Sequence, residues 1–179
     1  LGGLTKGLSV NTTSKTIIAG GVSSGVFRTT NGGTSWVKVS SNDEIHNVTA
    51  IAQDPRNGFQ NIWYYATGEM SGNSASLGSA YRGQGVWKSI DGGLNWSQIA
   101  ATNSLFELSD SSFDYINALA VNPLNGNLFI AATGKIYRYD GTNMSIELEI
   151  PFNGTGFTDV KIASNGRVFA SIVETSTAG

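Results

Sequence analysis

The chain has 179 residues, of which 40% are hydrophobic and 13% are charged, and its formal net charge is −2. This hydrophobic share is enough for a packed core, whereas a nucleic-acid-binding protein needs a basic face that this charge balance does not supply. The lack of cysteine excludes disulfide bonds and thiolate metal sites, and no apolar run reaches the roughly 18 residues of a membrane-spanning helix.

Short strands separated by turns recur along the chain in four similar units. Each unit opens with an apolar or alternating segment, which a turn such as Asp54–Gly58 or Asn122–Gly126 separates from a second apolar segment. The opening segments are 7–10, 48–53, 116–121 and 158–162, and the second segments are 16–19, 62–66, 128–132 and 168–172. A loop and a further strand follow the second segment. This order predicts four-stranded antiparallel sheets of the kind that form the blades of a propeller.

The third strand of the first two units ends in nearly the same hairpin. Segments 25–36 and 85–96 both read Gly, Val, aromatic, base, hydroxyl, any residue, Asn or Asp, Gly, Gly, two further residues and Trp. The Asn or Asp side chain accepts backbone N–H bonds, the glycines allow positive φ, and the hydroxyl adds a turn bond. We expect each Trp to return to the core of its blade. The residues with this structural role are Thr29, Asn31, Gly33, Trp36, Ser89, Asp91, Gly93 and Trp96.

The third and fourth units depart from this pattern. Segment 137–143 is shorter and lacks the Trp, which predicts an ordinary hairpin, and the fourth unit runs into a small polar tail. Residues 103–114 could form a short helical turn. The predicted fold is all-β, a partial β-propeller of about three blades plus half of a fourth in one incomplete domain, 1–179. The blade units span approximately 7–40, 48–100, 116–150 and 158–179.

Such an array is too small to close a ring, because propellers have roughly four to eight blades. Open blades expose strand edges and apolar faces, which natural proteins avoid. We therefore expect that the native polypeptide continues beyond Gly179, or that another protein chain supplies the missing surface.

The two hairpins resemble the Asp-boxes of the bacterial-neuraminidase-repeat type. Such boxes occur in sialidases, sortilin-like receptor domains and xyloglucan-active glycosidases, where they lie at the blade periphery, which implies a structural role. Segments 18–25, 53–56, 63–69 and 113–116 resemble the N-terminal propeller region of large secreted Bacteroidota proteins with type IX sorting domains. This resemblance implies a secreted or cell-surface location.

The longest interruption of the repeat, residues 69–84, joins the second and third strands of the second unit. Loops on a rigid scaffold often carry binding residues. Glu69, Tyr81 and Arg82 are therefore the candidate binding residues. The alternative is a Ser/Gly-rich surface loop that Tyr81 ties down.

Catalytic chemistry finds little support in the sequence. A glycosidase needs two carboxylates about 5 to 10 Å apart, and Glu69 could pair with Asp54 or Asp114. The better explanations are a turn for Asp54 and a strand start for Asp114. The only histidine, His46, is expected at the surface or at a strand start, so multi-His metal centres are excluded and a Ser-His-Asp triad is improbable.

No metal site or cofactor is predicted. Turn oxygens could hold Ca²⁺, but no acidic loop has the spacing of a known calcium motif.

The favoured function is a non-catalytic propeller segment for glycan or protein recognition, or a scaffold. Its expected partners are the remainder of its own propeller or another chain. The alternative is part of a sialidase-like or xyloglucanase-like glycoside hydrolase whose active site needs the missing blades, and a sortilin-like receptor is a third reading.

Overall fold

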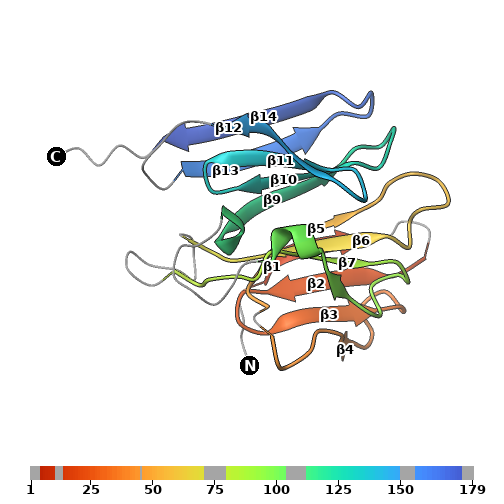
Figure 1. The fold of residues 1–179 in the computed structure, drawn as a ribbon. Coiled ribbons are helices and arrows are strands. Elements are labelled where there is room, and N and C mark those ends of the chain that lie inside the picture. Colours follow the sequence, from red (N-terminus) through yellow and green to blue (C-terminus); the bar gives the residue numbers. More distant parts are fainter. Residues whose placement is uncertain are drawn as a thin grey trace.

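A computed structural model describes residues 5–10, 14–44, 46–70, 80–103, 112–149 and 156–174 of the chain. Three antiparallel sheets of four strands and one sheet of two strands make up the fold (Figure 1). In the part of the chain that the structure describes, no helix is long and apolar enough to cross a membrane.

The strands of each sheet follow one another in chain order, and we call the sheets blades 1 to 4. Blade 1 contains β1 (Thr5–Val10), β2 (Ile17–Gly21), β3 (Gly25–Thr29) and β4 (Val37–Lys38). Blade 2 contains β5 (Val48–Gln53), β6 (Trp63–Thr67), β7 (Val86–Ser89) and β8 (Ser97–Gln98). Blade 3 contains β9 (Ile116–Val121), β10 (Leu128–Ala132), β11 (Lys135–Tyr139) and β12 (Met144–Glu149). Blade 4 contains β13 (Gly156–Ile162) and β14 (Val168–Glu174).

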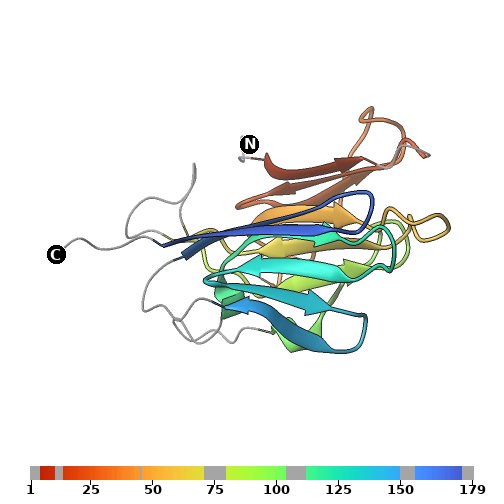
Figure 2. The same ribbon diagram turned by 90° about the horizontal axis from the view of Figure 1, so that it is seen from above.

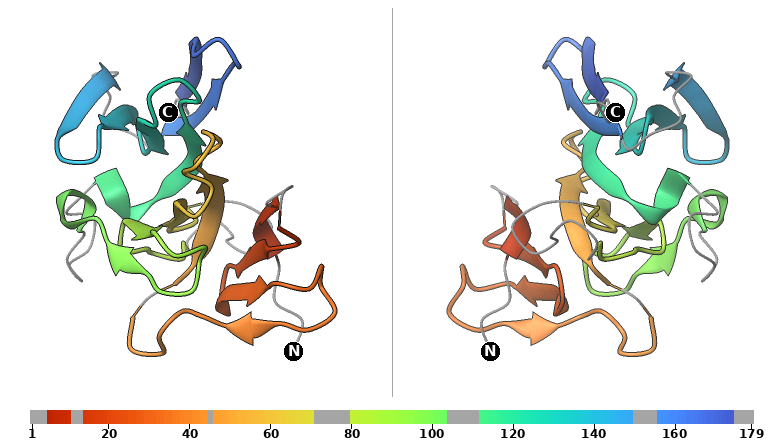
Figure 3. Two further views of the ribbon diagram at one scale, coloured as in Figure 1. Left: turned by 90° about the vertical axis from the view of Figure 1, so that its right-hand side faces the viewer. Right: turned by 90° about the vertical axis from the view of Figure 1, so that its left-hand side faces the viewer.

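The blades are arranged radially. The strands of all four sheets lie along nearly the same axis and alternate in direction (Figure 2), and a view along this axis shows the sheets grouped around their first strands (Figure 3). β1 contacts β5, β5 contacts β9, and β9 contacts β13. This arrangement confirms the predicted all-β partial propeller of three blades and half of a fourth.

Two short 3₁₀-helices, η1 (Ala100–Thr102) and η2 (Ser112–Asp114), lie between β8 and β9. η2 lies within segment 103–114, where the sequence suggests a short helical turn. Residues 104–111 of this segment lie outside the described part. The third unit has an ordinary hairpin, in which Asp140 Oδ1 accepts the backbone N–H groups of Thr142 and Asn143 at 2.9 and 2.7 Å.

The second strands of blades 2 and 3 form the core because a blade covers each of their faces. Every residue of β6 and of β10 is buried. On β6, Trp63 and Tyr65 pack with residues of blade 1, whereas Tyr64 and Ala66 pack with residues of blade 3. Successive side chains of a strand point to opposite faces, which explains why segment 62–66 is apolar throughout.

Hydrogen bonds connect the blades at their inner and outer ends. At the inner end, Thr49 Oγ1 donates to the carbonyl of Ile116 at 2.6 Å. At the outer end, Arg28 Nε donates to the carbonyl of Gly92 at 2.7 Å. Lys88, at the position equivalent to Arg28, instead places its ammonium 5.9 Å from the Tyr64 ring centre. Arg28 therefore joins blade 1 to the hairpin of blade 2.

Candidate functional site

The two repeated hairpins have the same internal hydrogen bonds. In blade 1, Thr29 Oγ1 donates to Asn31 Oδ1 at 2.8 Å and accepts from the N–H of Gly33 at 3.1 Å. In blade 2, Ser89 Oγ donates to Asp91 Oδ1 at 2.8 Å and accepts from the N–H of Gly93 at 2.9 Å. Gly33 and Gly93 both have positive φ. These side chains satisfy one another within the turn, an arrangement suited to a structural role.

The two tryptophans of the hairpins differ in burial. Trp96 is partly buried and meets the Tyr65 ring edge-on at a centroid distance of 4.7 Å. Trp36 is 42% exposed, so the expectation that it returns to a core is wrong. Trp96 lies on the face of blade 2 that packs against blade 1, whereas Trp36 lies on the corresponding face of blade 1, which is turned away from blade 2.

The predicted binding residues lie where blades 2 and 3 meet. Glu69 and Tyr81 form an antiparallel backbone bridge, with N–H to carbonyl distances of 2.7 and 2.8 Å. Glu69 is buried and Tyr81 is exposed. Arg82 Nε lies 3.0 Å from Asp114 Oδ1, which joins the end of the loop to η2. Residues 71–79 of this loop lie outside the described part.

The two proposed partners of Glu69 are buried and paired with arginines. Asp54 contacts Arg56 at 2.7 Å and accepts the N–H of the same residue, as expected for a turn residue. Asp54 follows β5, at the end of blade 2 opposite to Glu69, which follows β6. Asp114 is on the same end as Glu69 but is bound to Arg82. Neither geometry presents a free pair of carboxylates.

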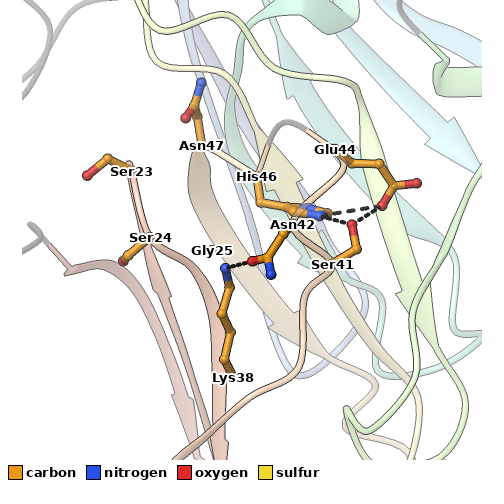
Figure 4. Close-up of a pocket in the computed structure, with 9 residues that line it drawn as sticks. All are labelled: Ser23, Ser24, Gly25, Lys38, Ser41, Asn42, Glu44, His46 and Asn47. Carbon is orange, nitrogen blue, oxygen red and sulfur yellow. Dashed lines mark hydrogen bonds and ion pairs between the residues drawn. The ribbon is translucent and has the colours of Figure 1, made fainter.

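A pocket that the sequence reasoning missed lies between blades 1 and 2 (Figure 4). Its volume is about 300 Å³, and most of its wall comes from the loop that connects β4 to β5. Lys38 Nζ donates to Asn42 Oδ1 at 2.6 Å, and Ser41 Oγ donates to Glu44 Oε2 at 2.7 Å. The lining residues are Ser23, Ser24, Gly25, Lys38, Ser41, Asn42, Glu44, His46 and Asn47. The one signal in the sequence is the density of polar residues in segment 40–47.

His46 anchors this loop. It lies just before β5, as a strand-start position predicts, but it is buried, so the surface placement is wrong. Its Nδ1 is 2.8 Å from the hydroxyl of Tyr65, and its Nε2 is 3.3 Å from Ser41 Oγ and 3.5 Å from Glu44 Oε2. The ring also meets Trp87 edge-on at a centroid distance of 5.1 Å. Packing against aromatic side chains of blade 2 removes His46 from solvent.

The geometry of this group argues against a nucleophilic serine. Burial lowers the pKa of His46 although Glu44 opposes the shift, and burial raises the pKa of Tyr65. Nδ1 faces the Tyr65 hydroxyl, whereas Ser41 Oγ and Glu44 Oε2 both lie on the Nε2 side of the ring. In a catalytic triad Nε2 must accept from the serine while a carboxylate holds Nδ1. Ser41, His46 and Glu44 therefore meet without the order that this chemistry requires.

A second, inner compartment of about 200 Å³ adjoins the pocket and shares Ser41, Glu44 and His46 with it. Its deeper wall is aromatic, with Tyr65, Trp87 and Trp96 in contact. The rings of Tyr65 and Trp87 are stacked at a centroid distance of 6.0 Å. Together the linings of the two cavities combine polar groups with aromatic side chains, the composition expected of a small-molecule site.

A third cavity, of about 250 Å³, lies along the first strands of the four blades. Among the described residues, its lining contains a single carboxylate, Asp159, whose Oδ1 is 3.5 Å from Lys161 Nζ. The other lining residues are Gly7, Leu8, Thr49, Ala50, Ile51, Asn117, Ala118 and Leu119. Within the described ranges, no group of three or more His, Cys, Asp or Glu residues could hold a metal ion.

The sequence matches no known family profile and no curated protein sequence. Its fold is similar to that of solved propeller proteins. An auxiliary nutrient-binding protein from Bacteroides thetaiotaomicron has a TM-score of 0.64 at 13% identity over 96% of the chain. A GH74 xyloglucanase from Xanthomonas campestris has a TM-score of 0.65 at 14% identity over 96% of the chain.

A third similar structure, described as the extracellular domain of a hybrid two-component system from B. thetaiotaomicron, has a TM-score of 0.64 at 12% identity over 98% of the chain. The chain spans 36%, 27% and 21% of the lengths of these three proteins. These likenesses establish the propeller fold, which carries both binding and enzymatic functions among the similar structures.

Proposed function

We propose that the chain is a non-catalytic segment of a β-propeller that acts in glycan or protein recognition or as a scaffold. The observation that carries this proposal is the cavity along the first strands, where the described part of the lining has one carboxylate, Asp159, which lies close to Lys161. Hydrolysis of a glycosidic bond requires two carboxyl groups about 5 to 10 Å apart. A polar pocket between blades 1 and 2 offers recognition chemistry instead.

The location and the extent of the protein are part of the same proposal. The resemblance to secreted Bacteroidota propellers supports a secreted or cell-surface location, and one similar structure is described as an extracellular domain. We infer that the chain is one incomplete propeller domain, completed by further blades of a larger protein or by another chain. Exposed apolar residues on the two terminal blades, including Leu8 and Phe169, support this reading.

We propose the same roles for the residues predicted from the sequence, apart from the core position of Trp36. The hydrogen bonds of the two hairpins support a structural function for the Asp-box residues. Glu69, Tyr81 and Arg82 remain the candidates at the junction of blades 2 and 3, where Tyr81 is the exposed member.

Binding and hydrolysis can be separated on one panel of polysaccharides. We expect the protein to retain a polysaccharide or a protein ligand in affinity electrophoresis or pull-down without releasing reducing sugar. The Glu69→Gln variant should leave the reducing-sugar assay at background. Release of reducing ends by the parent protein, lost in Glu69→Gln, would establish the glycoside hydrolase reading in its place.

A further inference from the structure

The pocket between blades 1 and 2 has the features of a built site. Two compartments meet at Ser41, Glu44 and His46, all within one short loop. The buried imidazole of His46 is fixed by Tyr65 on one side and by Ser41 and Glu44 on the other. The loop is therefore held to the core of blade 2 rather than extended into solvent, and its polar side chains are positioned around the opening (Figure 4).

The charges around the outer compartment balance. Lys38 and Glu44 are the two charged side chains of its lining, and they have opposite signs. His46 is neutral because burial lowers its pKa. The remaining polar groups are the hydroxyls of serines and the amides of Asn42 and Asn47. Such a lining offers hydrogen-bond donors and acceptors without an excess charge that would select an ion.

The inner compartment adds apolar surface. Trp87 and Trp96 line it together with Val39, next to the shared polar residues. A sugar ring presents hydroxyl edges and apolar C–H faces, so it can use a hydroxyl- and amide-lined entrance and an indole at the same time. A purely apolar ligand would take the exposed polar groups of the outer compartment out of water without replacing their contacts with water, which costs free energy.

We infer that this pocket, with Ser41, Asn42 and Glu44 at its entrance and Trp96 at its floor, binds one residue of a neutral saccharide. The inference rests on the proposed recognition function and names its ligand class and its location. The site differs from the junction of blades 2 and 3 that the sequence singled out, and it requires no bond to be broken.

The test uses the 179-residue chain and neutral gluco-, xylo- and manno-oligosaccharides, with isothermal titration calorimetry and tryptophan fluorescence as readouts. We expect at least one series to bind and to change the fluorescence. Asn42→Ala and Glu44→Gln should each weaken binding about tenfold, because the first removes a hydrogen bond to the ligand and the second replaces a charged acceptor by a weaker, neutral one. The matched control is Asp43→Asn, which removes the same charge as Glu44→Gln from an exposed neighbour outside the pocket lining.

The outcomes separate this inference from the function on which it rests. Equal melting temperatures of the variants exclude a loss of folding. Saccharide binding that Asn42→Ala and Glu44→Gln leave unchanged overturns the site and preserves recognition. Binding of a zwitterionic amino acid in place of saccharides, with the same sensitivity to Glu44→Gln, overturns the ligand class. No binding in any series overturns the inference, whereas cleavage of the oligosaccharides overturns the non-catalytic function itself.

Discussion

Asp91 and Asn31 occupy the same place in two hairpins but differ in charge. Each accepts a serine or threonine hydroxyl and a backbone N–H four residues on. Burial raises the pKa of Asp91, but hydrogen bonds from Asn95, Ser89 and the N–H of Leu94 outweigh it and hold the pKa at about 2. The hairpin of blade 2 therefore depends on an ionised carboxylate, whereas that of blade 1 uses a neutral amide.

Acid should weaken the hairpin of blade 2 selectively. Because the pKa of Asp91 is lower in the folded protein, its contribution to stability is present above its unfolded value of about 3.9 and is lost as the pH falls toward about 2. We expect Asp91→Asn to reduce the drop in melting temperature between pH 6 and pH 2.5, and Asn31→Asp to increase it. Asp91 is solvent-exposed, so screening keeps the effect small. Identical drops in all three proteins would contradict this assignment.

The hairpins also show what residue type and spacing alone can predict. Their bonds join residues within four positions of one another, so residue type and spacing were enough to predict them. The burial of Trp36 was predicted wrongly because it depends on a neighbouring blade rather than on the hairpin. The burial of His46 was missed for the same reason, since Tyr65 and Trp87 are distant in sequence.

At the scale of elements, the connections between strands are as constrained as the strands. Gly85, which precedes β7, has a φ of +78°, and a Cβ there would lie 2.0 Å from the carbonyl oxygen of Thr102. Thr102 Oγ1 accepts the N–H of Val86 at 2.9 Å, so η1 is held against the start of β7. The glycine is required by this close approach as well as by its backbone conformation.

A matched pair of glycines separates these two effects. Gly58 has a φ of +85°, but a Cβ there would meet no atom within 4 Å. Gly58→Ala should lower the free energy of unfolding by about 1–2 kcal/mol, the cost of a left-handed conformation for alanine. Gly85→Ala should cost about 3 kcal/mol or more, because η1 must also move away from β7. Urea denaturation measures both, and equal losses would show that the contact with Thr102 is relieved at no cost.

The elements themselves were largely predictable, whereas the pocket was not. Alternation, apolar runs and glycine-containing turns place the strands because each of these signals is local. The pocket between blades 1 and 2 depends on how Ser41 and His46 approach Tyr65 and Trp96 of the next blade. Likewise, the ion pair of Arg82 with Asp114 joins residues 32 positions apart. Sequence spacing carries no information on such distances.

At the scale of the whole molecule, blade 4 exposes a face that carries the apolar side chains Phe157, Phe169 and Val173 beside Asp159, Lys161 and Ser171. The register of β13 and β14 places Val173 opposite Phe157, and Phe169 lies on the same face. The opposite face carries Val160, which is buried against blade 3. Phe169 is 57% exposed and Val173 is 56% exposed. In a propeller this face would contact the next blade, so it is the surface on which a further sheet or a second chain would pack.

The isolated chain should therefore associate through blade 4. We expect sedimentation velocity to show species larger than the 18.8 kDa monomer as the concentration rises. Replacing Phe169 and Val173 together by serine should shift the distribution toward the monomer, because apolar area drives such contacts at roughly 25 cal/mol per Å². Ile90→Ser is the control, since Ile90 is 72% exposed at a hairpin and not on this face. A monomer at every concentration would show that the exposed apolar side chains of blade 4 do not drive association. This result would count against a propeller completed by further blades.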